Sequence, residues 1–225
     1  MADRPEGDRK SVASPPVLVT DPVEIARKEA SNGLRQFDAV IARIDQARSE
    51  PRPFRLRPSD LLNLNCIALD GINRFAGNYR PSAIYITGSK HQPPPVDTVP
   101  SLVEELCEYV NDHFESASAL HLAAYVMWRI NWIHPFDDGN GRTARAASYL
   151  VLCVKLDSRL PGKPTIPDLI VDKKKPYYDA LEAADLAWAD KAQIDLSQME
   201  ELMENLLGAQ LVNAIEQARG VPIDL

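Results

Sequence analysis

The sequence is poor in cysteine, which excludes one common way of stabilising a small protein. Its 225 residues include three cysteines, Cys66, Cys107 and Cys153, and these show no metal-binding spacing. An odd number of scattered cysteines argues against a disulfide framework. We expect all three to be reduced thiols buried on apolar helix faces, as is typical of a cytoplasmic protein.

Long hydrophobic runs and an excess of positive charge are also missing. No run of eighteen apolar residues occurs, and the N-terminus has charges but no apolar segment. We therefore expect neither a membrane span nor a signal peptide, and a cytoplasmic location. The 25 basic residues against 32 acidic ones give a net charge of −7. That balance argues against nucleic acid as the main partner.

The residues that are present predict a helical protein with a substantial core. Hydrophobic residues make up 45% of the chain, and the length fits one large domain or two small ones. Asp21 and Pro22 are typical of a helix start, and apolar residues then recur at helical spacing to about Arg48. Further helices are expected over 59–74, 99–114, 118–133, 140–157, 176–188 and 195–219, with a loop over 165–175. We interpret residues 1–20 as a disordered tail.

One short segment has the pattern of a β-strand. Ala83-Ile84-Tyr85-Ile86-Thr87 combines β-branched and aromatic residues and lies between turn-forming residues, which predicts a hairpin. A lone β element in a helical protein has exposed edges. From the residues alone, a surface ribbon and a binding edge are equally good interpretations.

The centre of the sequence is the loop over residues 134–145, His-Pro-Phe-Asp-Asp-Gly-Asn-Gly-Arg-Thr-Ala-Arg, between two apolar runs. Pro135 disfavours helical geometry at His134, so the first helix should end there. The next should begin near Asn140, where free N–H groups and the positive end of the helix dipole form an anion site. Arg142 and Arg145 lie three apart on one face of that first turn, which suits a polyphosphate.

Two further side chains of this loop suit nucleotide chemistry. Asp138 lies where a cation that bridges phosphates would need an oxygen ligand, although it could instead cap the helix. His134 could accept a proton or only cap the preceding helix. Arg142 could bind phosphate or pair with Asp138 on the surface.

The loop resembles the signature of the Fic (filamentation-induced-by-cAMP) family, H-P-F-x-[D/E]-G-N-[G/K]-R-x-x-R, and matches every fixed position. The resemblance covers roughly residues 21–205. It implies an all-α Fic fold, a helical bundle with one β-hairpin flap, in a single domain over 21–225. Within that domain we expect a helical N-terminal extension over 21–50, a Fic core over about 59–190 and a C-terminal helix over 195–219.

The resemblance also implies an activity, the transfer of AMP from ATP to a Ser, Thr or Tyr hydroxyl of a target protein with Mg²⁺. His134 would be the general base and Asp138 the magnesium ligand. The implied catalytic residues are His134, Asn140 and Arg142. The implied nucleotide-binding residues are Gly139, Asn140, Gly141, Arg142, Arg145 and Tyr178, the last by stacking on adenine. The flap residues Ile84, Tyr85, Ile86 and Thr87 would dock the target's chain by strand addition.

The family resemblance leaves open which group is transferred and how the activity is inhibited. Some transfer UMP, phosphate or phosphocholine or remove AMP, and a non-catalytic binding module or a DNA-linked regulator are further alternatives. Many Fic proteins carry an inhibitory glutamate in the pattern [S/T]-x-x-x-E-[G/N]. The candidates here, Glu24 and Glu201, both fail at the last position. Restraint would then come from a partner protein, from homo-oligomerisation or from a degenerate motif in the first helix.

Overall fold

α-Helices make up most of the chain in the computed structural model, which describes residues 11–12 and 17–220. Their bounds are α1 (Pro22–Ser49), α2 (Pro58–Leu69), α3 (Val99–Asp112), α4 (Ala119–Ile133), α5 (Asn140–Lys155), α6 (Ile166–Asp172), α7 (Lys174–Lys191) and α8 (Ser197–Arg219). The described strands are β1 (Ser11–Val12) and β2 (Tyr85–Ile86), and a 3-10 turn covers Val96–Thr98. The all-α prediction is confirmed.

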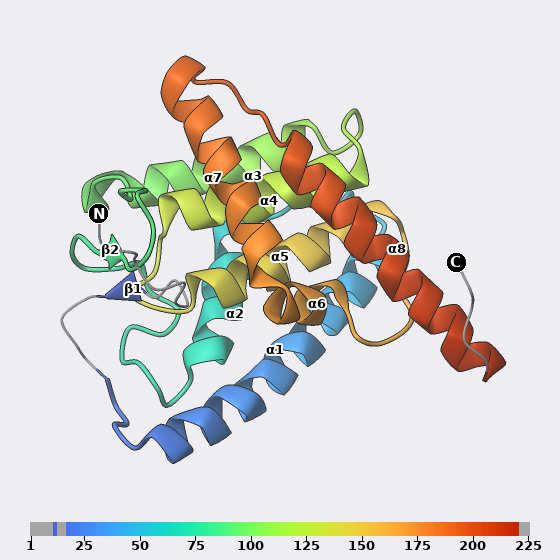
Figure 1. Cartoon of the computed structure of the whole chain (residues 1–225), viewed down its shortest axis with the longest axis horizontal. Coiled ribbons are helices and arrows are strands. Elements are labelled where there is room, and N and C mark those ends of the chain that lie inside the picture. Colours follow the sequence, from blue (N-terminus) through green and yellow to red (C-terminus); the bar gives the residue numbers. More distant parts are fainter. Residues whose placement is uncertain (1–10, 13–16, 221–225) are drawn as a thin grey trace.

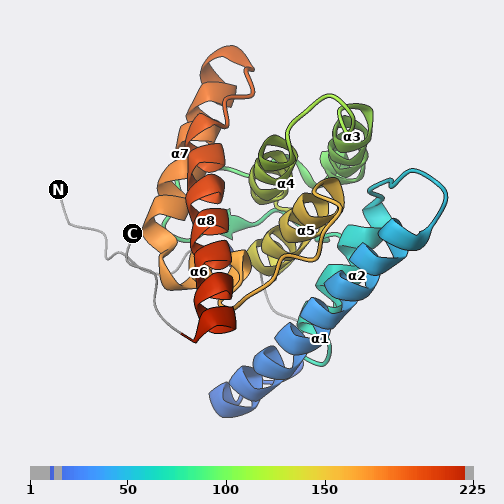
Figure 2. The same cartoon turned by 90° about the vertical axis from the view of Figure 1, so that its right-hand side faces the viewer.

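The two apolar runs that flank the central loop form the middle of the molecule. Figure 2 shows α4 and α5 between the α1–α2 pair on one side and α7 with α8 on the other. In Figure 1, α7 and α8 are seen in front of α4 and α5. Because α5 is covered on several sides, its residues from Ala146 to Val154 are all buried. The largest fully buried side chains include Trp128, Phe136 and Ile130.

The helix boundaries follow local signals in some places and tertiary contacts in others. The Asp21 carboxylate accepts a hydrogen bond from the Val23 N–H at 2.9 Å, so α1 begins as predicted. The second helix was expected to reach about Arg74 but ends at Leu69, where the chain turns through Gly71 at φ 67°. The loop expected over 165–175 instead contains α6, whose first turn is capped by Thr165 and Asp168.

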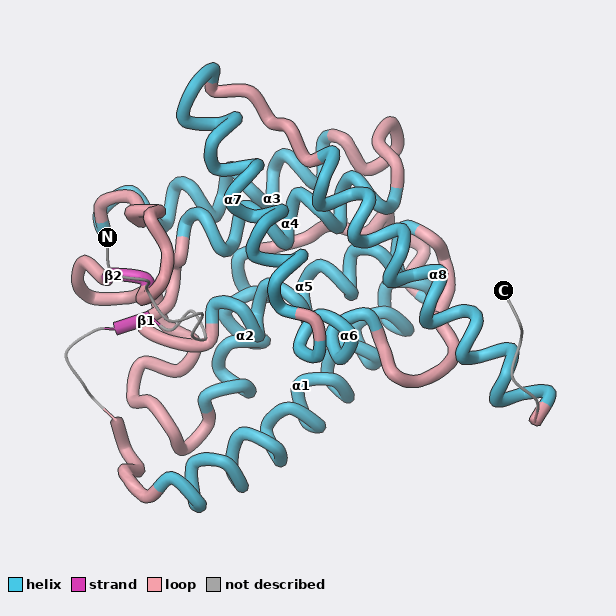
Figure 3. Tube along the Cα trace, in the orientation of Figure 1, coloured by secondary structure: helices cyan, strands magenta, loops and turns pink. Residues whose placement is uncertain are grey.

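The β element differs from the predicted hairpin. Among the described residues, β2 pairs antiparallel with β1 near the N-terminus, with Ser11 opposite Ile86 and Val12 opposite Tyr85. Figure 3 shows this small sheet surrounded by loops at one edge of the molecule. The disordered tail is likewise corrected for residues 11–12 and 17–18, because the Leu18 N–H also donates to the Ile72 carbonyl at 2.8 Å. The rest of that prediction, over 1–10 and 13–16, lies outside the described residues.

The cysteines are all free, but they do not share one environment. Cys107 and Cys153 are buried as predicted, and burial raises the pKa of Cys107 to about 12. The prediction was wrong for Cys66, which is exposed. Within the described part of the chain, no helix is both long and apolar enough to cross a bilayer.

Candidate active site

The loop between α4 and α5 is held in shape by its own residues. His134 ends α4 in the left-handed region at φ 51°, with its N–H donating to the Ile130 carbonyl at 2.9 Å. The Asn140 amide closes the loop: its oxygen accepts from the Phe136 N–H at 2.9 Å and its nitrogen donates to the Phe136 carbonyl at 2.8 Å. Phe136 itself is 1% exposed and anchors the loop in the core.

Gly139 allows the turn into α5. It adopts φ 77°, and a Cβ atom there would lie 3.1 Å from the Asn65 side-chain nitrogen and 3.3 Å from Leu69. Any other residue would combine backbone strain with tight contacts against α2. The sequence prediction of a helix start at Asn140 is confirmed. Glycine is required at position 139 both for its positive φ and because α2 packs closely against it.

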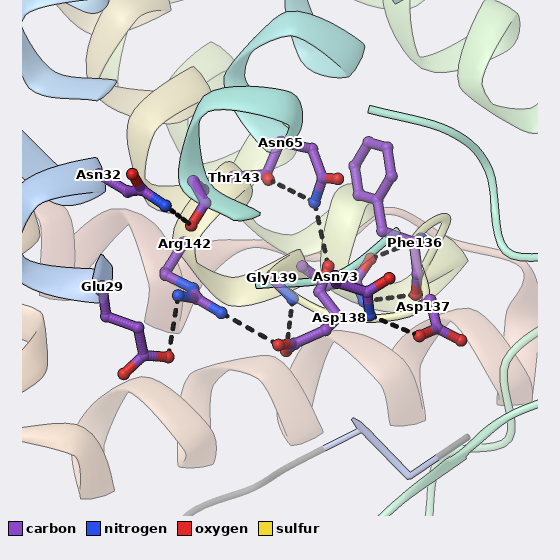
Figure 4. Close-up of polar contacts among 12 residues, drawn as sticks. Glu29, Asn32, Asn65, Asn73, Phe136, Asp137, Asp138, Gly139, Arg142 and Thr143 are labelled. Carbon is purple, nitrogen blue, oxygen red and sulfur yellow. Dashed lines mark hydrogen bonds and ion pairs between the residues drawn. The ribbon is translucent and has the colours of Figure 1, made fainter. Parts of the chain in front are cut away.

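Three polar side chains outside the loop fix its position. Asn65 of α2 donates to the Asp138 carbonyl at 3.0 Å and accepts from the Gly77 N–H at 3.0 Å, and Asn73 donates to the Asp137 carboxylate at 2.8 Å (Figure 4). Arg80 is 2% exposed and donates to the His134 carbonyl at 2.9 Å. Sequence reasoning missed all three. Only Asn65 left a signal, as a polar residue among the apolar residues of its helix.

Asn65 gives a direct test of this support. Replacing it by alanine leaves the Asp138 carbonyl and the Gly77 N–H without their partner, so we expect N65A to lower the free energy of unfolding by about 2–4 kcal/mol. Urea unfolding followed by circular dichroism measures the change. The matched control is N63A, at an exposed asparagine of the same helix, which should stay within about 0.5 kcal/mol of the wild type. Equal stability of N65A and N63A would contradict the role of Asn65.

His134 is held in the form that a general base needs. The residue is 6% exposed, and Nδ1 of its ring lies 3.1 Å from the Asn131 carbonyl oxygen. A carbonyl only accepts, so Nδ1 carries the proton and Nε2 is the basic nitrogen. Burial, aided by the neighbouring His91 and Arg80, lowers the pKa of His134 to about 4 against the opposing effects of Asn131 and Asp138. The imidazole is therefore neutral at pH 7.

Arg142 makes two ion pairs at the start of α5. Its guanidinium donates to the Asp138 carboxylate at 3.1 Å and to the Glu29 carboxylate at 3.0 Å, and Glu29 comes from α1 (Figure 4). The second oxygen of Asp138 accepts from the Gly139 N–H at 2.6 Å, directly before the start of α5, and no side chain of the described residues caps α5. The glutamate that reaches the loop is thus Glu29, whereas sequence reasoning named Glu24 and Glu201.

Arg145 lies one turn further along the same face. Its guanidinium folds back toward Gly141, where a Cβ atom would be 3.3 Å from Nη1. Burial lowers its pKa, and Tyr177 and Tyr178 are close enough to raise it in part. The Tyr177 hydroxyl accepts from Asn131 at 2.8 Å in a buried position, while Tyr178 is only half-buried.

These side chains surround one cavity of about 460 Å³, which is within the range of small-molecule sites. Every predicted nucleotide and metal residue lines it: His134, Asp138, Gly139, Asn140, Gly141, Arg142, Arg145 and Tyr178. Ile86 is the flap residue in its lining, whereas Ile84 is buried in the core and Tyr85 and Thr87 are exposed. Residues missed from the sequence also line it: Glu29, Ser89, His91, Asn131 and Asp185.

The donor set of the cavity fits one hard cation held jointly with a ligand. Asp138 provides a carboxylate that is 47% exposed at the cavity wall. No cluster of three or more His, Cys, Asp or Glu side chains suited to a metal occurs among the residues that the structure describes. Mg²⁺ commonly takes one or two carboxylates together with phosphate oxygens and water, so a magnesium site here would rest on Asp138 as its protein ligand.

Comparison with known proteins finds similarity to one family in both the sequence and the fold. Residues 55–152 match the model of the Fic/DOC family. Among solved structures, a Fic domain containing signaling protein from Bacteroides thetaiotaomicron superposes with a TM-score of 0.70 at 21% identity, covering 92% of this chain and 78% of that one. Fic-1 from C. elegans superposes with a TM-score of 0.64 at 20% identity, covering 84% and 52%. This chain therefore has the fold of Fic proteins, and residues 55–152 are similar in sequence to the Fic/DOC family.

Its curated relatives carry the name protein adenylyltransferase. The Drosophila persimilis protein adenylyltransferase Fic is 29% identical over 129 residues, which is 56% of this chain and 23% of that protein. The Caenorhabditis briggsae protein adenylyltransferase fic-1 is 31% identical over 112 residues, 49% of this chain and 20% of the relative. The match thus spans about a quarter or less of the length of these relatives.

Proposed function

We propose that the chain is a protein adenylyltransferase, which moves AMP from ATP to a Ser, Thr or Tyr hydroxyl of a target protein. The observation that carries this proposal is the state of His134. A buried, neutral imidazole with a protonated Nδ1 lies in the same cavity as the N-terminus of α5 and two arginines. A proton acceptor beside a polyphosphate site is what hydroxyl attack on phosphorus requires.

Each residue then has a defined task. His134 Nε2 accepts the proton of the target hydroxyl as its oxygen attacks the α-phosphorus and pyrophosphate leaves. The N–H groups around Gly139, Asn140 and Gly141 stabilise charge on the transferred phosphate, and Arg142 and Arg145 hold the outer phosphates. Asp138 would hold Mg²⁺, which neutralises phosphate charge when bound. Tyr178 stacks on the adenine.

Asn140 acts through the loop as well as at the phosphate. Both ends of its side-chain amide are engaged by the Phe136 backbone, so its backbone N–H is the group that we assign to the nucleotide. The side chain holds the loop in the shape that presents this N–H to the phosphates.

The target would dock beside β2. Ile86 lines the cavity, so a chain added to this strand would bring its hydroxyl residues near His134. In the structure, β1 is already paired with β2. A docked target would therefore either displace Ser11–Val12 or use the opposite edge of the strand.

Glu29 offers a built-in restraint on this activity. It holds Arg142 by an ion pair, and Asp138 holds the same guanidinium from the other side. Phosphates and Mg²⁺ must compete with both contacts before the arginine is redirected. This restraint would act beside, or in place of, an inhibitory partner protein or a homo-oligomer.

Removing the Glu29 charge should therefore raise the activity. A partly exposed ion pair is worth about 0.2–1 kcal/mol, so E29Q should increase the rate of AMP transfer at limiting ATP by about 1.5- to 5-fold. E24Q is the matched control, because Glu24 lies on the same helix and makes no contact with Arg142. An E24Q variant as active as E29Q, or an E29Q variant slower than wild type, would count against a restraining role for Glu29.

Labelled ATP distinguishes AMP transfer from its closest rival. With the label on the α-phosphate, AMP transfer makes the protein radioactive, whereas phosphate transfer does so only with the label on the γ-phosphate. Glycine at position 141, rather than lysine, favours AMP. Protein labelling from γ-labelled ATP alone would overturn the proposal.

A further inference from the structure

The loop that joins α1 to α2 is rich in arginine although the chain as a whole is acidic. Residues 51–57 read Pro-Arg-Pro-Phe-Arg-Leu-Arg, and Arg52, Arg55 and Arg57 are all exposed. We call these seven residues the arginine loop. The net charge of the chain is −7, so three basic side chains within six positions form a local reversal of sign. Figure 2 shows this loop at the edge of the molecule, beyond the ends of α1 and α2.

The backbone of the arginine loop is held in place by buried side chains and by hydrogen bonds. Phe54 and Leu56 are buried, while the alternate residues Arg55 and Arg57 point outward, as in an extended strand. The Asn111 side chain bonds to both the N–H and the carbonyl of Leu56, at 2.8 and 2.9 Å. Because the backbone is fixed, little conformational freedom is lost when the arginines bind a ligand.

These arginines border a broad hollow, and their positive charges are not paired with its carboxylates. The hollow is about 1140 Å³ in volume and is lined by Arg43 as well as the loop, with Glu50, Asp60 and Glu115 as its carboxylates. Arg43 pairs with Asp60 at 3.0 Å, and Glu50 accepts from Gln46 at 2.7 Å. Arg52, Arg55 and Arg57 form no ion pair with any residue in the described part of the chain.

We propose that the arginine loop docks an acidic, extended segment of a partner protein. Arg55 and Arg57 are two residues apart in an extended chain, so their attachment points lie about 6.6 Å apart, the spacing of alternate residues in a strand. A segment with an acidic residue at every second position matches that spacing. Guanidinium groups bind carboxylates in a bidentate way, and the acidic surface elsewhere repels such a segment.

The docking site is separate from the nucleotide cavity. The two are joined by α2, whose start follows the arginine loop and whose end at Leu69 lies beside Gly139. Twelve helical residues span about 18 Å, so a bound segment leaves the cavity open. The surface would recruit a target or regulator without occupying the site of transfer.

Fluorescence anisotropy with the full chain tests this proposal. The probe is a fluorescein-labelled ten-residue peptide of alternating serine and glutamate, and the same peptide with glutamine shows the uncharged background. R52Q/R55Q/R57Q should weaken binding of the glutamate peptide about tenfold at low salt. The matched control is R27Q/R74Q/R219Q, which removes three other exposed positive charges and should bind within about twofold of wild type.

Several outcomes would overturn the proposal. Equal losses of peptide affinity in both triple variants would show general electrostatic attraction. An arginine-loop variant that binds the peptide as tightly as wild type would show that the peptide binds at another site. Tighter binding of a ten-nucleotide oligothymidine, lost in the same variant, would assign the loop to nucleic acid instead. Circular dichroism confirms that each variant is folded, and AMP transfer to a free peptide should be unchanged in both.

Discussion

The H134A variant should transfer AMP about 10²- to 10⁴-fold more slowly than wild type at neutral pH, the range for loss of a positioned general base. The protein should keep its affinity for Mg-ATP, because His134 contacts the target hydroxyl rather than the phosphates in the proposed arrangement. Initial rates with α-labelled ATP and saturating target peptide measure the first effect, and calorimetric titration of ATP measures the second.

The control for this variant is H113A, at an exposed histidine of the α3 C-terminus that should be dispensable.

The pH profile of wild type supplies an independent readout. Burial lowers the pKa of His134 to about 4, so the base stays unprotonated, and the rate should hold, until the pH falls toward that value. An unperturbed histidine would lose half its activity near pH 6.5. Comparable rates in H134A and H113A would remove His134 from the mechanism.

Replacing Arg145 by alanine should weaken Mg-ATP binding about 10- to 100-fold, which corresponds to one or two lost hydrogen bonds to a charged group. Arg145 lines the cavity and makes no ion pair with a described residue, so its charge is available to a phosphate. Burial lowers its pKa, so a bound anion would stabilise the charged form of the guanidinium. Calorimetric titration with Mg-ATP measures the effect.

R142A provides the comparison, since Arg142 must first leave Glu29 and Asp138. The loss of affinity in R142A should be smaller than in R145A, because phosphate binding by Arg142 already has to replace two ion pairs. Affinity retained in R145A but lost in R142A would reverse this assignment of the phosphate contacts.

The sequence was sufficient to predict the central loop because the determinants of its shape are local. Pro135 limits His134, Gly139 allows the positive φ, and the two arginines follow at a helical spacing of three. The apolar runs on either side predicted α4 and α5 for the same reason. Local signals of this kind act within one or two turns of helix, and they were correct at the start of α1 as well.

The residues that support and restrain the loop were missed because their partners are distant in sequence. Glu29 and Arg142 are 113 positions apart, and Asn65 and Asp138 are 73 apart. No periodicity or spacing connects such residues, so a motif search favoured Glu24 over Glu29. His91 belongs to no sequence motif either, yet it lines the cavity, and its Nε2 lies 2.7 Å from the Trp132 carbonyl oxygen.

The strand prediction failed in the choice of partner for the same reason. Ile84 to Thr87 have the composition of a strand, but composition does not specify which segment pairs with it. In the structure the partner is β1, more than 70 residues earlier in the chain. The exposed Cys66 shows a similar limit, because it lies between buried Asn65 and half-buried Ile67 on a helix whose apolar stripe is wide.

Mass spectrometry of a protein lysate tests the central claim most directly. Wild type and H134A are each incubated with the lysate and a pair of isotopically distinct ATP forms, and modified peptides are identified by their paired signals. The account predicts AMP on serine, threonine or tyrosine side chains with wild type and its near absence with H134A. Equal labelling by the two proteins, or transfer of a group other than AMP, would contradict it.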